Sequence, residues 1–310
     1  MSTRRDRIFL FLKGVGMGCA DIIPGVSGGT IAFITGIYEE LINSIKAVDL
    51  EALKLLLSGK FSAFWSKING GFLIVLLLGI LTSILSLARI ITTLLANHPI
   101  QLWSFFFGLI AISALVVSRD IHRWNITVVL GLLVGGLAAY LITQAVPAET
   151  PNSLPLIFLS GAVAICAMIL PGISGSFILL ILGKYTFILT AIKEFQLGTL
   201  LVFSLGCLLG LMTFSRLISW LFKKYRNLTI AVLAGFMIGS LNKVWPWKKT
   251  VETYMDRHGE IKPLVQENIL PTTFQSMGQE PYFWQALLFC ALGIGLVVLL
   301  EKLAANLKNA

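Results

Sequence analysis

Charged residues are scarce in this chain of 310 residues. Asp, Glu, Lys and Arg make up 13% of the sequence, hydrophobic residues make up 56%, and the mean hydropathy is +0.87. A soluble domain has about 25% charged residues, so the composition excludes an ordinary water-soluble protein. Uncharged runs such as 90–118 and 125–148 exceed the roughly 20 residues that a helix needs to cross a bilayer. The sequence predicts an integral membrane protein with several spans.

Cysteine and histidine are also rare, with four and three copies. The cysteines lie singly in apolar segments, without the short spacing of metal or redox motifs, which favours packing roles. They are Cys19, Cys166, Cys207 and Cys290. We therefore expect no metal site, no bound cofactor and no catalytic residues.

The net charge of +9 is distributed unevenly along the chain. Lys and Arg gather at the chain start, within 46–67, 119–123 and 223–226, and near the C-terminus. Short basic loops normally stay on the cytoplasmic side of a membrane. The charge therefore predicts topology rather than a nucleic-acid partner, and both termini are expected in the cytoplasm.

Two apolar stretches of the chain repeat one another. Residues 14–46 and 161–193 align at an offset of 147, and both contain the string Pro-Gly-x-Ser-Gly. The similarity continues at an offset of 127, where Gly71 meets Gly198 and Gly108 meets Gly235. Duplicated broken helices are typical of transporters built from inverted repeats.

The sequence therefore predicts an all-α polytopic membrane protein. It consists of two inverted repeats, each with one re-entrant broken-helix hairpin plus three transmembrane helices. The first repeat covers 1–148 and holds a re-entrant segment 8–46, an interfacial segment 47–67 and spans 71–96, 100–118 and 124–146. The second covers 149–310 and holds a re-entrant segment 155–193, spans 198–222 and 228–245, an outer loop 246–280 and a span 282–302.

The chemistry of the repeated motif points to anion binding. A Pro-Gly step interrupts each helix, and a half-helix then begins near Ser27 in the first copy. The free N–H groups and the positive dipole end of a half-helix suit an anion, especially a phosphate. The candidate phosphate-binding residues are Ser27, Gly28, Gly29, Thr30, Ser174, Gly175 and Ser176. Another interpretation remains open, in which the glycines only allow helices to cross closely.

Arg89 and Arg216 occupy equivalent positions of the two repeats, within otherwise uncharged segments. A charged side chain in lipid costs at least ~2.5–3.5 kcal/mol, so it usually faces a partner or a cavity. The planar guanidinium group suits a phosphate. Both residues are therefore candidate phosphate ligands, with extension of the side chain to the interface as the alternative.

Asp21 lies three residues before the break and aligns with Met168 in the second copy. A carboxylate at this depth can bind a proton or Na⁺, or pair with an Arg. Asp21 is therefore the candidate site for coupling to a proton or Na⁺ gradient. A local cap or a structural salt bridge is the alternative.

An enzymatic interpretation rests on the Gly-x-Ser-Gly strings around Ser27 and Ser174, which match the nucleophile motif of rhomboid intramembrane proteases. A nucleophilic serine needs a base within hydrogen-bond reach. The three histidines, His98, His122 and His258, lie in loops or at predicted helix ends. Since two equivalent motifs also do not suit one nucleophile, we expect no enzymatic activity.

The motifs Asp21-Ile-Ile-Pro-Gly-Val-Ser-Gly-Gly-Thr30 and Leu170-Pro-Gly-Ile-Ser-Gly-Ser176 resemble the polyprenyl-phosphate transporter (PopT) family of prokaryotes. The resemblance covers essentially the whole chain. It implies a flippase of the cell membrane that returns undecaprenyl phosphate from the outer to the inner leaflet during cell-wall synthesis. It also implies two re-entrant hairpins and coupling to an ion gradient.

This implied function agrees with the chemistry of the motifs, because a lipid carrier needs to shield only the phosphate while the tail stays in the bilayer. We hypothesise that the phosphate binds between the two breaks, that Arg89 and Arg216 neutralise it, and that the inverted halves rock. A transporter of a small anion, or an ion exchanger of the same architecture, is the alternative. A purely structural membrane protein is the third possibility.

Overall fold

The computed structural model describes residues 4–23, 26–147, 150–255 and 261–308. Five helices of this part are long and apolar enough to cross a membrane. They are α6 (Gly70–Asn97), α7 (Pro99–Ser118), α8 (Ile126–Gln144), α12 (Leu197–Lys224) and α15 (Phe283–Lys308). The predicted span 228–245 corresponds to the shorter helix α13 (Arg226–Ser240), which begins two residues earlier and is followed by a turn. The expectation of a mostly helical, multi-pass membrane protein is confirmed.

The outer faces of the long helices are apolar. On α6, for example, Leu77, Leu81 and Leu85 are about half exposed or more, and Leu85 reaches 84%. Apolar surface on this scale is unfavourable in water and favourable in lipid. These faces therefore contact the hydrocarbon of the bilayer.

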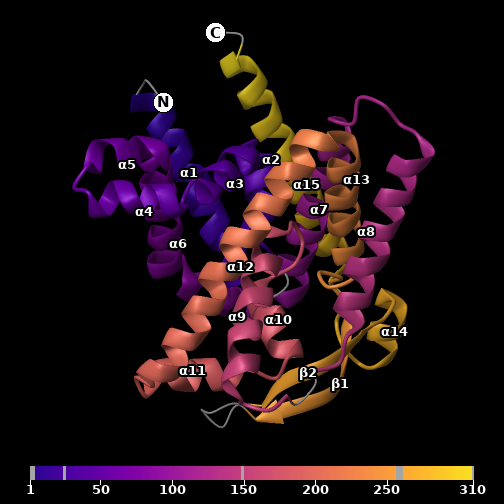
Figure 1. Ribbon diagram of the computed structural model, residues 1–310. Helices are drawn as coiled ribbons and strands as arrows, with labels where there is room; N and C mark the ends of the chain where they lie inside the picture. The colour runs from indigo at the N-terminus through magenta and orange to yellow at the C-terminus, as the bar shows by residue number, and fades with distance from the viewer. Residues whose placement is uncertain (1–3, 24–25, 148–149, 256–260, 309–310) are drawn as a thin grey trace.

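Each repeated motif forms a broken helical segment. The first broken segment comprises α1 (Arg4–Ile22), α2 (Gly28–Ile34) and α3 (Tyr38–Lys46), and the second comprises α9 (Leu154–Ile169), α10 (Gly175–Ile181) and α11 (Tyr185–Lys193). α10 and α11 repeat the bounds of α2 and α3 at the offset of 147, and α10 and α11 meet at 109°. Figure 1 shows α1 and α3 extending toward the end of the molecule that holds both termini, whereas α11 lies at the opposite end.

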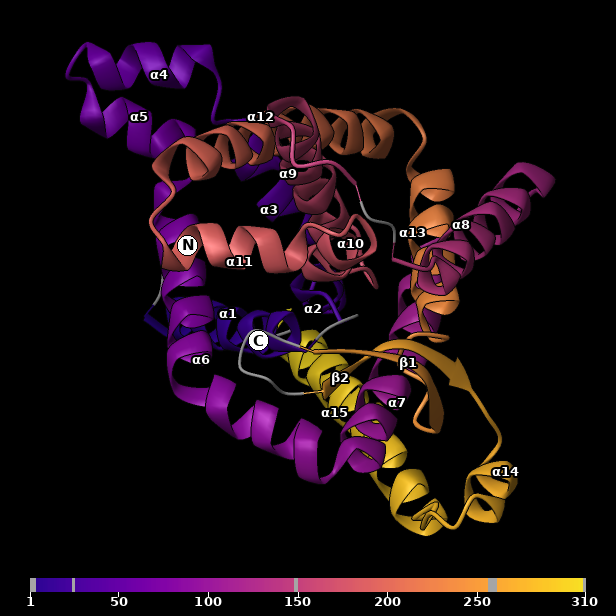
Figure 2. The same cartoon turned by 90° about the horizontal axis from the view of Figure 1, so that it is seen from below.

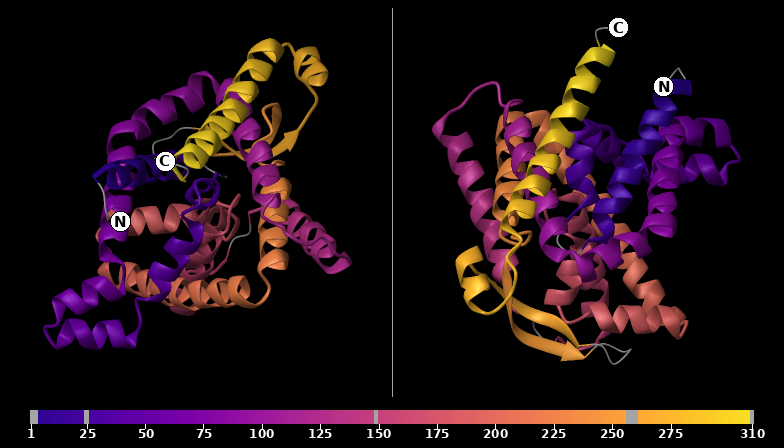
Figure 3. Two further views of the ribbon diagram at one scale, coloured as in Figure 1. Left: turned by 90° about the horizontal axis from the view of Figure 1, so that it is seen from above. Right: turned by 180° about the vertical axis from the view of Figure 1, so that it is seen from behind.

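The segment predicted at 47–67 folds as two short helices, α4 (Leu50–Leu57) and α5 (Phe61–Lys67). The Asp49 side chain caps α4 by accepting from the Ala52 N–H at 2.8 Å, and Lys67 pairs with Asp49 at 3.0 Å. Leu57 and Phe61 are largely exposed. Figure 3 shows this helix pair projecting sideways at the end that holds the termini.

The prediction of a plain loop at 246–280 differs from the structure. This region contains an antiparallel hairpin of β1 (Lys248–Met255) and β2 (Ile261–Asn268), followed by α14 (Pro271–Ser276). Tryptophans anchor the region, since the Trp245 indole donates to the Ile269 carbonyl at 2.9 Å and the Trp247 indole donates to the Pro281 carbonyl at 2.8 Å. The hairpin departs from an all-α fold. β1 contains the β-branched residues Thr250, Val251 and Thr253, and β2 contains Ile261 and Val265, and such residues favour strands.

The helices pack in four close pairs, two within a half and two between halves. α1 lies on α6 and α9 lies on α12, whereas α8 packs against α13 and α7 packs against α15. Glycines allow this closeness: a Cβ atom at Gly79 would lie 2.3 Å from the Phe11 carbonyl oxygen, and one at Gly206 would lie 2.0 Å from the Phe158 carbonyl oxygen. Viewed from below, α6, α7, α13 and α12 surround the two broken segments (Figure 2).

Candidate functional site

The break in the first broken segment, residues 26–30, is called the first tip. Ser27 caps α2, its buried hydroxyl accepting from the Gly29 N–H at 3.1 Å and donating to the Met168 carbonyl at 3.0 Å. The Gly28 N–H donates to the Asp21 carboxylate at 2.7 Å, and the Thr30 N–H donates to the Ser27 carbonyl at 2.9 Å. The first three N–H groups of α2 are therefore satisfied by the protein itself. Pro24 and Gly25 lie outside the described residues.

The corresponding break at residues 170–176, the second tip, is also buried but satisfies fewer of its N–H groups, and it is called open in this sense. Ser174 caps α10 through a long contact of 3.4 Å from the Phe177 N–H, and its hydroxyl lies 2.6 Å from that of Ser176. Within the described chain, the N–H groups of Gly175 and Ser176 have no hydrogen-bond acceptor. A helix N-terminus with unsatisfied donors and a positive dipole end favours a bound anion.

The two tips meet in the interior. Besides the bond from Ser27 to Met168, the Gly172 N–H donates to the buried Thr30 hydroxyl at 2.9 Å. A Cβ atom at Gly29 would lie 2.7 Å from the Ile169 carbonyl oxygen, so only glycine fits at this contact. Gly172 has a φ of +92°, a backbone conformation that favours glycine. The structure therefore brings both copies of the motif together, and binding of a phosphate between them stays a prediction.

Asp21 acts as a local cap of α2. Its carboxylate approaches the backbone so closely that a Cβ atom at Gly28 would lie 2.6 Å from it. The equivalent position in the second copy is Met168, which contributes no carboxylate. Hence the first tip holds an anionic group of the protein where an external anion would otherwise bind.

Arg89 and Arg216 are the twentieth residues of α6 and α12, two helices of equal length. Arg89 is exposed, and Arg216 is partly buried and donates to the Met212 carbonyl one turn earlier at 2.7 Å. Among the described residues, neither side chain forms a hydrogen bond or ion pair with a tip. Of the residues predicted to form one phosphate site, the structure therefore joins those of the two tips and leaves the two Arg side chains apart from them.

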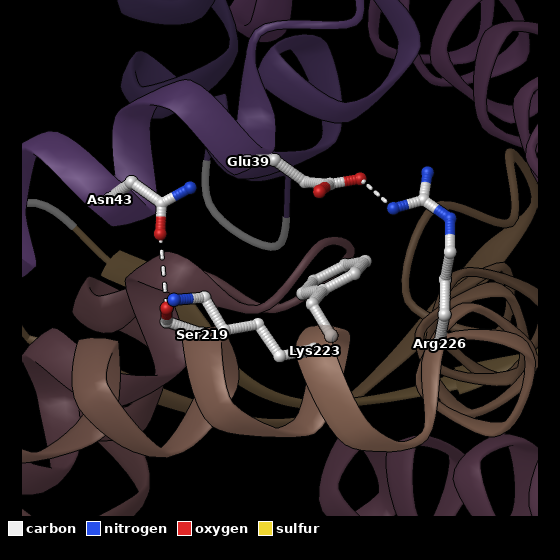
Figure 4. A pocket seen from close by; sticks show the side chains of 6 residues that line it. Glu39, Asn43, Ser219, Lys223 and Arg226 are labelled. Carbon is white, nitrogen blue, oxygen red and sulfur yellow. Dashed lines mark hydrogen bonds and ion pairs between the residues drawn. The ribbon is translucent and has the colours of Figure 1, made fainter.

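A polar cavity of about 220 Å³ lies between α3, the end of α12 and the start of α13. We call it the α3–α12 cavity (Figure 4). It is lined by Glu39, Asn43, Ser219, Phe222, Lys223 and Arg226. Glu39 and Arg226 form an ion pair at 2.7 Å, and Ser219 donates to the Asn43 side chain at 3.0 Å.

A smaller polar pocket of about 20 Å³ lies under the β hairpin, at the opposite end from the termini. It is lined by Thr143, Gln144, Asn242, Lys243, Lys248, Gln266 and Asn268. The ammonium group of Lys243 lies 4.2 Å from the centre of the Phe177 ring of α10, and Lys248 donates to the Lys243 carbonyl at 2.5 Å. Burial, and secondarily the charge of Lys243, lowers the pKa of Lys248 to about 7.

Lys184, between α10 and α11, is almost fully buried, with 1% exposure. Its ammonium group donates to the Thr150 and Pro151 carbonyls and to the Asn152 side chain. With three acceptors the ammonium group is fully satisfied. Lys184 therefore fastens the turn between α10 and α11 to the chain that leads into α9.

Comparison with known proteins bears on both tips. The sequence matches the family described as undecaprenyl phosphate translocase-like over residues 17–262, most of the chain. The chain belongs to this family. It is 47% identical to a polyprenyl-phosphate transporter of Vibrio cholerae over 95% of this chain and 96% of that protein, and 35% identical to a polyprenyl-phosphate transporter of Staphylococcus aureus over 76% of this chain and 85% of that protein. No solved structure gave a match.

The family match includes both tips and the α3–α12 cavity, and it includes the pocket under the β hairpin except for Gln266 and Asn268. The sequence analysis missed the lysine pair under the β hairpin and the cavity residues on α12 and α13. One signal was present, because Lys243 lies inside the predicted span 228–245, where a charge requires an explanation. Lys223 and Arg226 gave no comparable signal, since basic residues at the end of a span are ordinary topology signals.

Proposed function

We propose that this member of the undecaprenyl phosphate translocase-like family is a membrane transporter of polyprenyl phosphate. Its cargo would be undecaprenyl phosphate, moved from the outer to the inner leaflet of the cell membrane. The names of two relatives support the cargo. One structural observation carries the mechanism: two half-helix N-termini meet in the interior of an apolar helical protein.

The architecture proposed for this function is a pair of inverted repeats with two re-entrant hairpins. The equal bounds of α2 and α3 with α10 and α11 at the offset of 147, and the equal lengths of α6 and α12, support the repeat. The extension of the first broken segment toward one end, and of α11 toward the other, supports the inversion (Figure 1). The basic residues near the termini support a cytoplasmic position for the end that contains them.

The phosphate-binding site that we propose lies at the second tip, beside its contact with the first tip. Gly175 and Ser176 supply backbone N–H donors, and Ser174 and Ser176 supply hydroxyl groups. Ser27, Gly28, Gly29 and Thr30 would take part once the bonds between the tips open. The prenyl tail would remain in lipid, against the apolar outer faces of the helices.

Opening requires the tips to separate, which breaks the two bonds that involve Ser27 and Thr30. The tightly crossed pairs α1–α6 and α9–α12 are suited to move as units, each with its tip. The pairs α8–α13 and α7–α15 join the two halves. Because these two pairs join the halves, the packing favours a mechanism in which two segments move against a fixed frame. It argues against a mechanism in which whole halves rock. Arg89 and Arg216, on the moving helices α6 and α12, would meet the phosphate as it leaves the tips.

Coupling to a proton or Na⁺ gradient is proposed for Asp21, because its carboxylate holds the first tip closed through Gly28. Transport in liposomes would be measured against pH and Na⁺ for the wild type and Asp21→Asn. We expect the dependence on one of the two ions to be lost in the variant. The same dependence in both proteins would remove Asp21 from the coupling mechanism.

Direct binding and transport test the function. Purified protein is titrated with undecaprenyl phosphate and, in liposomes, assayed for movement of the lipid between leaflets. Arg89→Ala and Arg216→Ala should each weaken binding about tenfold or more, because a charge-assisted hydrogen bond contributes roughly 1.5–3 kcal/mol. Leu85→Ala, on the lipid-facing side of α6, serves as the control. Absence of binding by folded wild-type protein would contradict the lipid assignment and favour a small-anion transporter.

A further inference from the structure

The α3–α12 cavity has the size and lining of a site for a small charged group. A single water molecule needs about 10–15 Å³ of such space, and the cavity offers about 220 Å³. Its walls come from the first broken segment and from two helices of the second half. In Figure 4 the side chains of Glu39 and Asn43 on α3 face those of Ser219 and Lys223 on α12, with Arg226 opposite Glu39.

Positive charge predominates around this cavity. Lys223 and Arg226 line it, and Lys46 reaches its wall by donating to the Ser219 hydroxyl at 3.2 Å. Glu39 is the one carboxylate among the lining residues. Glu40, beside it on α3, instead accepts from the Asn69 side chain at 2.9 Å. An anion inside the cavity would therefore meet an excess of cations.

The hydrogen-bonding groups also suit an anion. The Asn43 amide oxygen accepts from Ser219, which leaves the NH₂ group of Asn43 as a donor. The Lys223 ammonium group and the Arg226 guanidinium group are further donors. Arg binds phosphate through two parallel hydrogen bonds, a geometry that a carboxylate shares. Glu39 now occupies that position at 2.7 Å from Arg226.

The ion pair between Glu39 and Arg226 can exchange its anionic partner. The two side chains are 46% and 47% exposed, and exposed pairs are weakly held. A phosphate dianion carries more charge than a carboxylate and can replace it at the guanidinium group. The ion pair at the cavity is thus a contact that a phosphate can replace.

Aromatic packing connects this cavity with the first tip. The Phe222 ring, which lines the cavity, lies 6.0 Å from the Tyr38 ring and 6.4 Å from the Phe33 ring of α2. Phe33 and Tyr38 are themselves 4.8 Å apart. The cavity lies at the start of α13, near the end of the molecule where the termini lie (Figure 1). The aromatic contacts thus place the cavity next to the first broken segment, on the side of this end.

We propose that the α3–α12 cavity is a second phosphate-monoester site, where the lipid headgroup binds after it leaves the tips and before it reaches the membrane surface. This assignment rests on the proposed transport of polyprenyl phosphate. Arg226, Lys223 and Asn43 bind the phosphate oxygens there, and Glu39 competes with the phosphate for Arg226. Return of Glu39 to Arg226 expels the headgroup and closes the cavity.

Lysine modification tests the site in the wild-type protein. Purified protein is treated with an amine-acetylating reagent, and the rates at Lys223 and Lys224 are measured by mass spectrometry. Lys224 is the matched control because it is adjacent but lies over Trp220 and Tyr225, outside the cavity lining. Inorganic phosphate and undecaprenyl phosphate should each slow acetylation of Lys223 about threefold or more, relative to Lys224. Undecaprenol and a chloride solution of equal ionic strength should not.

Substitutions of the cations and of Glu39 should change the affinity for inorganic phosphate in opposite directions. Arg226→Gln and Lys223→Gln should weaken inorganic phosphate binding about threefold to tenfold, since each removes one charged donor. Glu39→Gln should strengthen it by a similar factor, and Lys224→Gln should leave it unchanged. A Glu39→Gln variant that binds phosphate no better than the wild type would overturn the proposed competition.

The outcomes separate this site from the proposed function. If the wild type transports undecaprenyl phosphate but the lipid protects neither lysine, or both equally, the second site is wrong and the transport function stands. Protection by inorganic phosphate alone would overturn the role as a headgroup site. If the wild type neither binds nor transports the lipid, the proposed function itself fails.

Discussion

The two tips share one backbone design but differ in what occupies their half-helix N-termini. The first tip is closed by Asp21 on Gly28 and by Ser27 on Gly29. At the second tip, Met168 replaces the carboxylate, and Gly175 has no acceptor among the described residues. One copy of the motif therefore contains its own anion, and the other is ready to accept one.

Under the proposed function, this difference would let two equivalent motifs act one after the other. If both tips were open, they would compete for one phosphate with equal strength. If both were closed, neither would bind it. In the proposed mechanism, a tip closed by a removable carboxylate and a tip that is open would give phosphate movement a direction. The following variants test this asymmetry.

The contact between the tips should be the most sensitive feature. Gly29→Ala places a methyl group 2.7 Å from the Ile169 carbonyl oxygen, so the tips must separate. We expect overpacking to destabilise the protein by about 1–3 kcal/mol and to abolish transport. Thermal unfolding in detergent and transport in liposomes would be measured. Gly71→Ala is the control, because its Cβ would meet no atom within 4 Å and alanine favours the helix. Equal thermal stability and equal transport of the two variants would contradict a tight contact at the tips.

Serine substitutions should separate binding from stability. Ser174→Ala removes a hydroxyl from the open tip and should weaken binding of undecaprenyl phosphate about tenfold. Ser27→Ala removes a cap and the bond to Met168, so it should lower stability by about 1–2 kcal/mol with a smaller effect on affinity. Calorimetric titration and thermal unfolding in detergent measure the two effects. The reverse pattern would place the phosphate at the first tip.

Removing the carboxylate should make the tips more alike. Asp21→Asn keeps an oxygen that can accept from Gly28 but removes the negative charge. We expect the affinity for undecaprenyl phosphate to rise about threefold to tenfold, because a competing anion is lost. Met168→Leu, at the equivalent position of the second copy, should leave affinity unchanged. Weaker binding by Asp21→Asn would show that the carboxylate supports the site rather than competes for it.

The smallest effect is expected at the pocket below the β hairpin. The folded pKa of Lys248 is lowered from 10.5 to about 7, so between these values the unfolded state binds more protons. Stability should therefore rise as pH increases from about 7 to 10. In Lys248→Met this rise should be smaller, whereas Lys249→Met, at an exposed neighbour, should retain it. Identical pH profiles of thermal unfolding for the wild type and Lys248→Met would contradict the burial of this charge.

Much of the fold follows from local sequence. The Pro-Gly breaks, the Ser caps and the long uncharged runs identify α2, α10 and most spans to within a few residues, because turn residues and apolar length are local properties. The contacts of Ser27 with Met168 and of Thr30 with Gly172 follow only from the way the two repeats pack. The sequence aligns Arg89 with Arg216 but does not show that both lie away from the tips in this conformation. The α3–α12 cavity was not foreseen, since its cations come from three helices.

Two helices of the first half pack on helices of the second half, and this packing has a consequence for synthesis of the protein. α8 emerges during synthesis long before α13, and α7 long before α15, yet these are the helices on which they pack. Until the second half is inserted, the glycines of α8 that fit against α13, such as Gly135, face lipid instead. The first half is therefore an unfinished membrane protein for much of translation. Cellular quality control must therefore tolerate helices of the first half whose packing partners have not yet been synthesised.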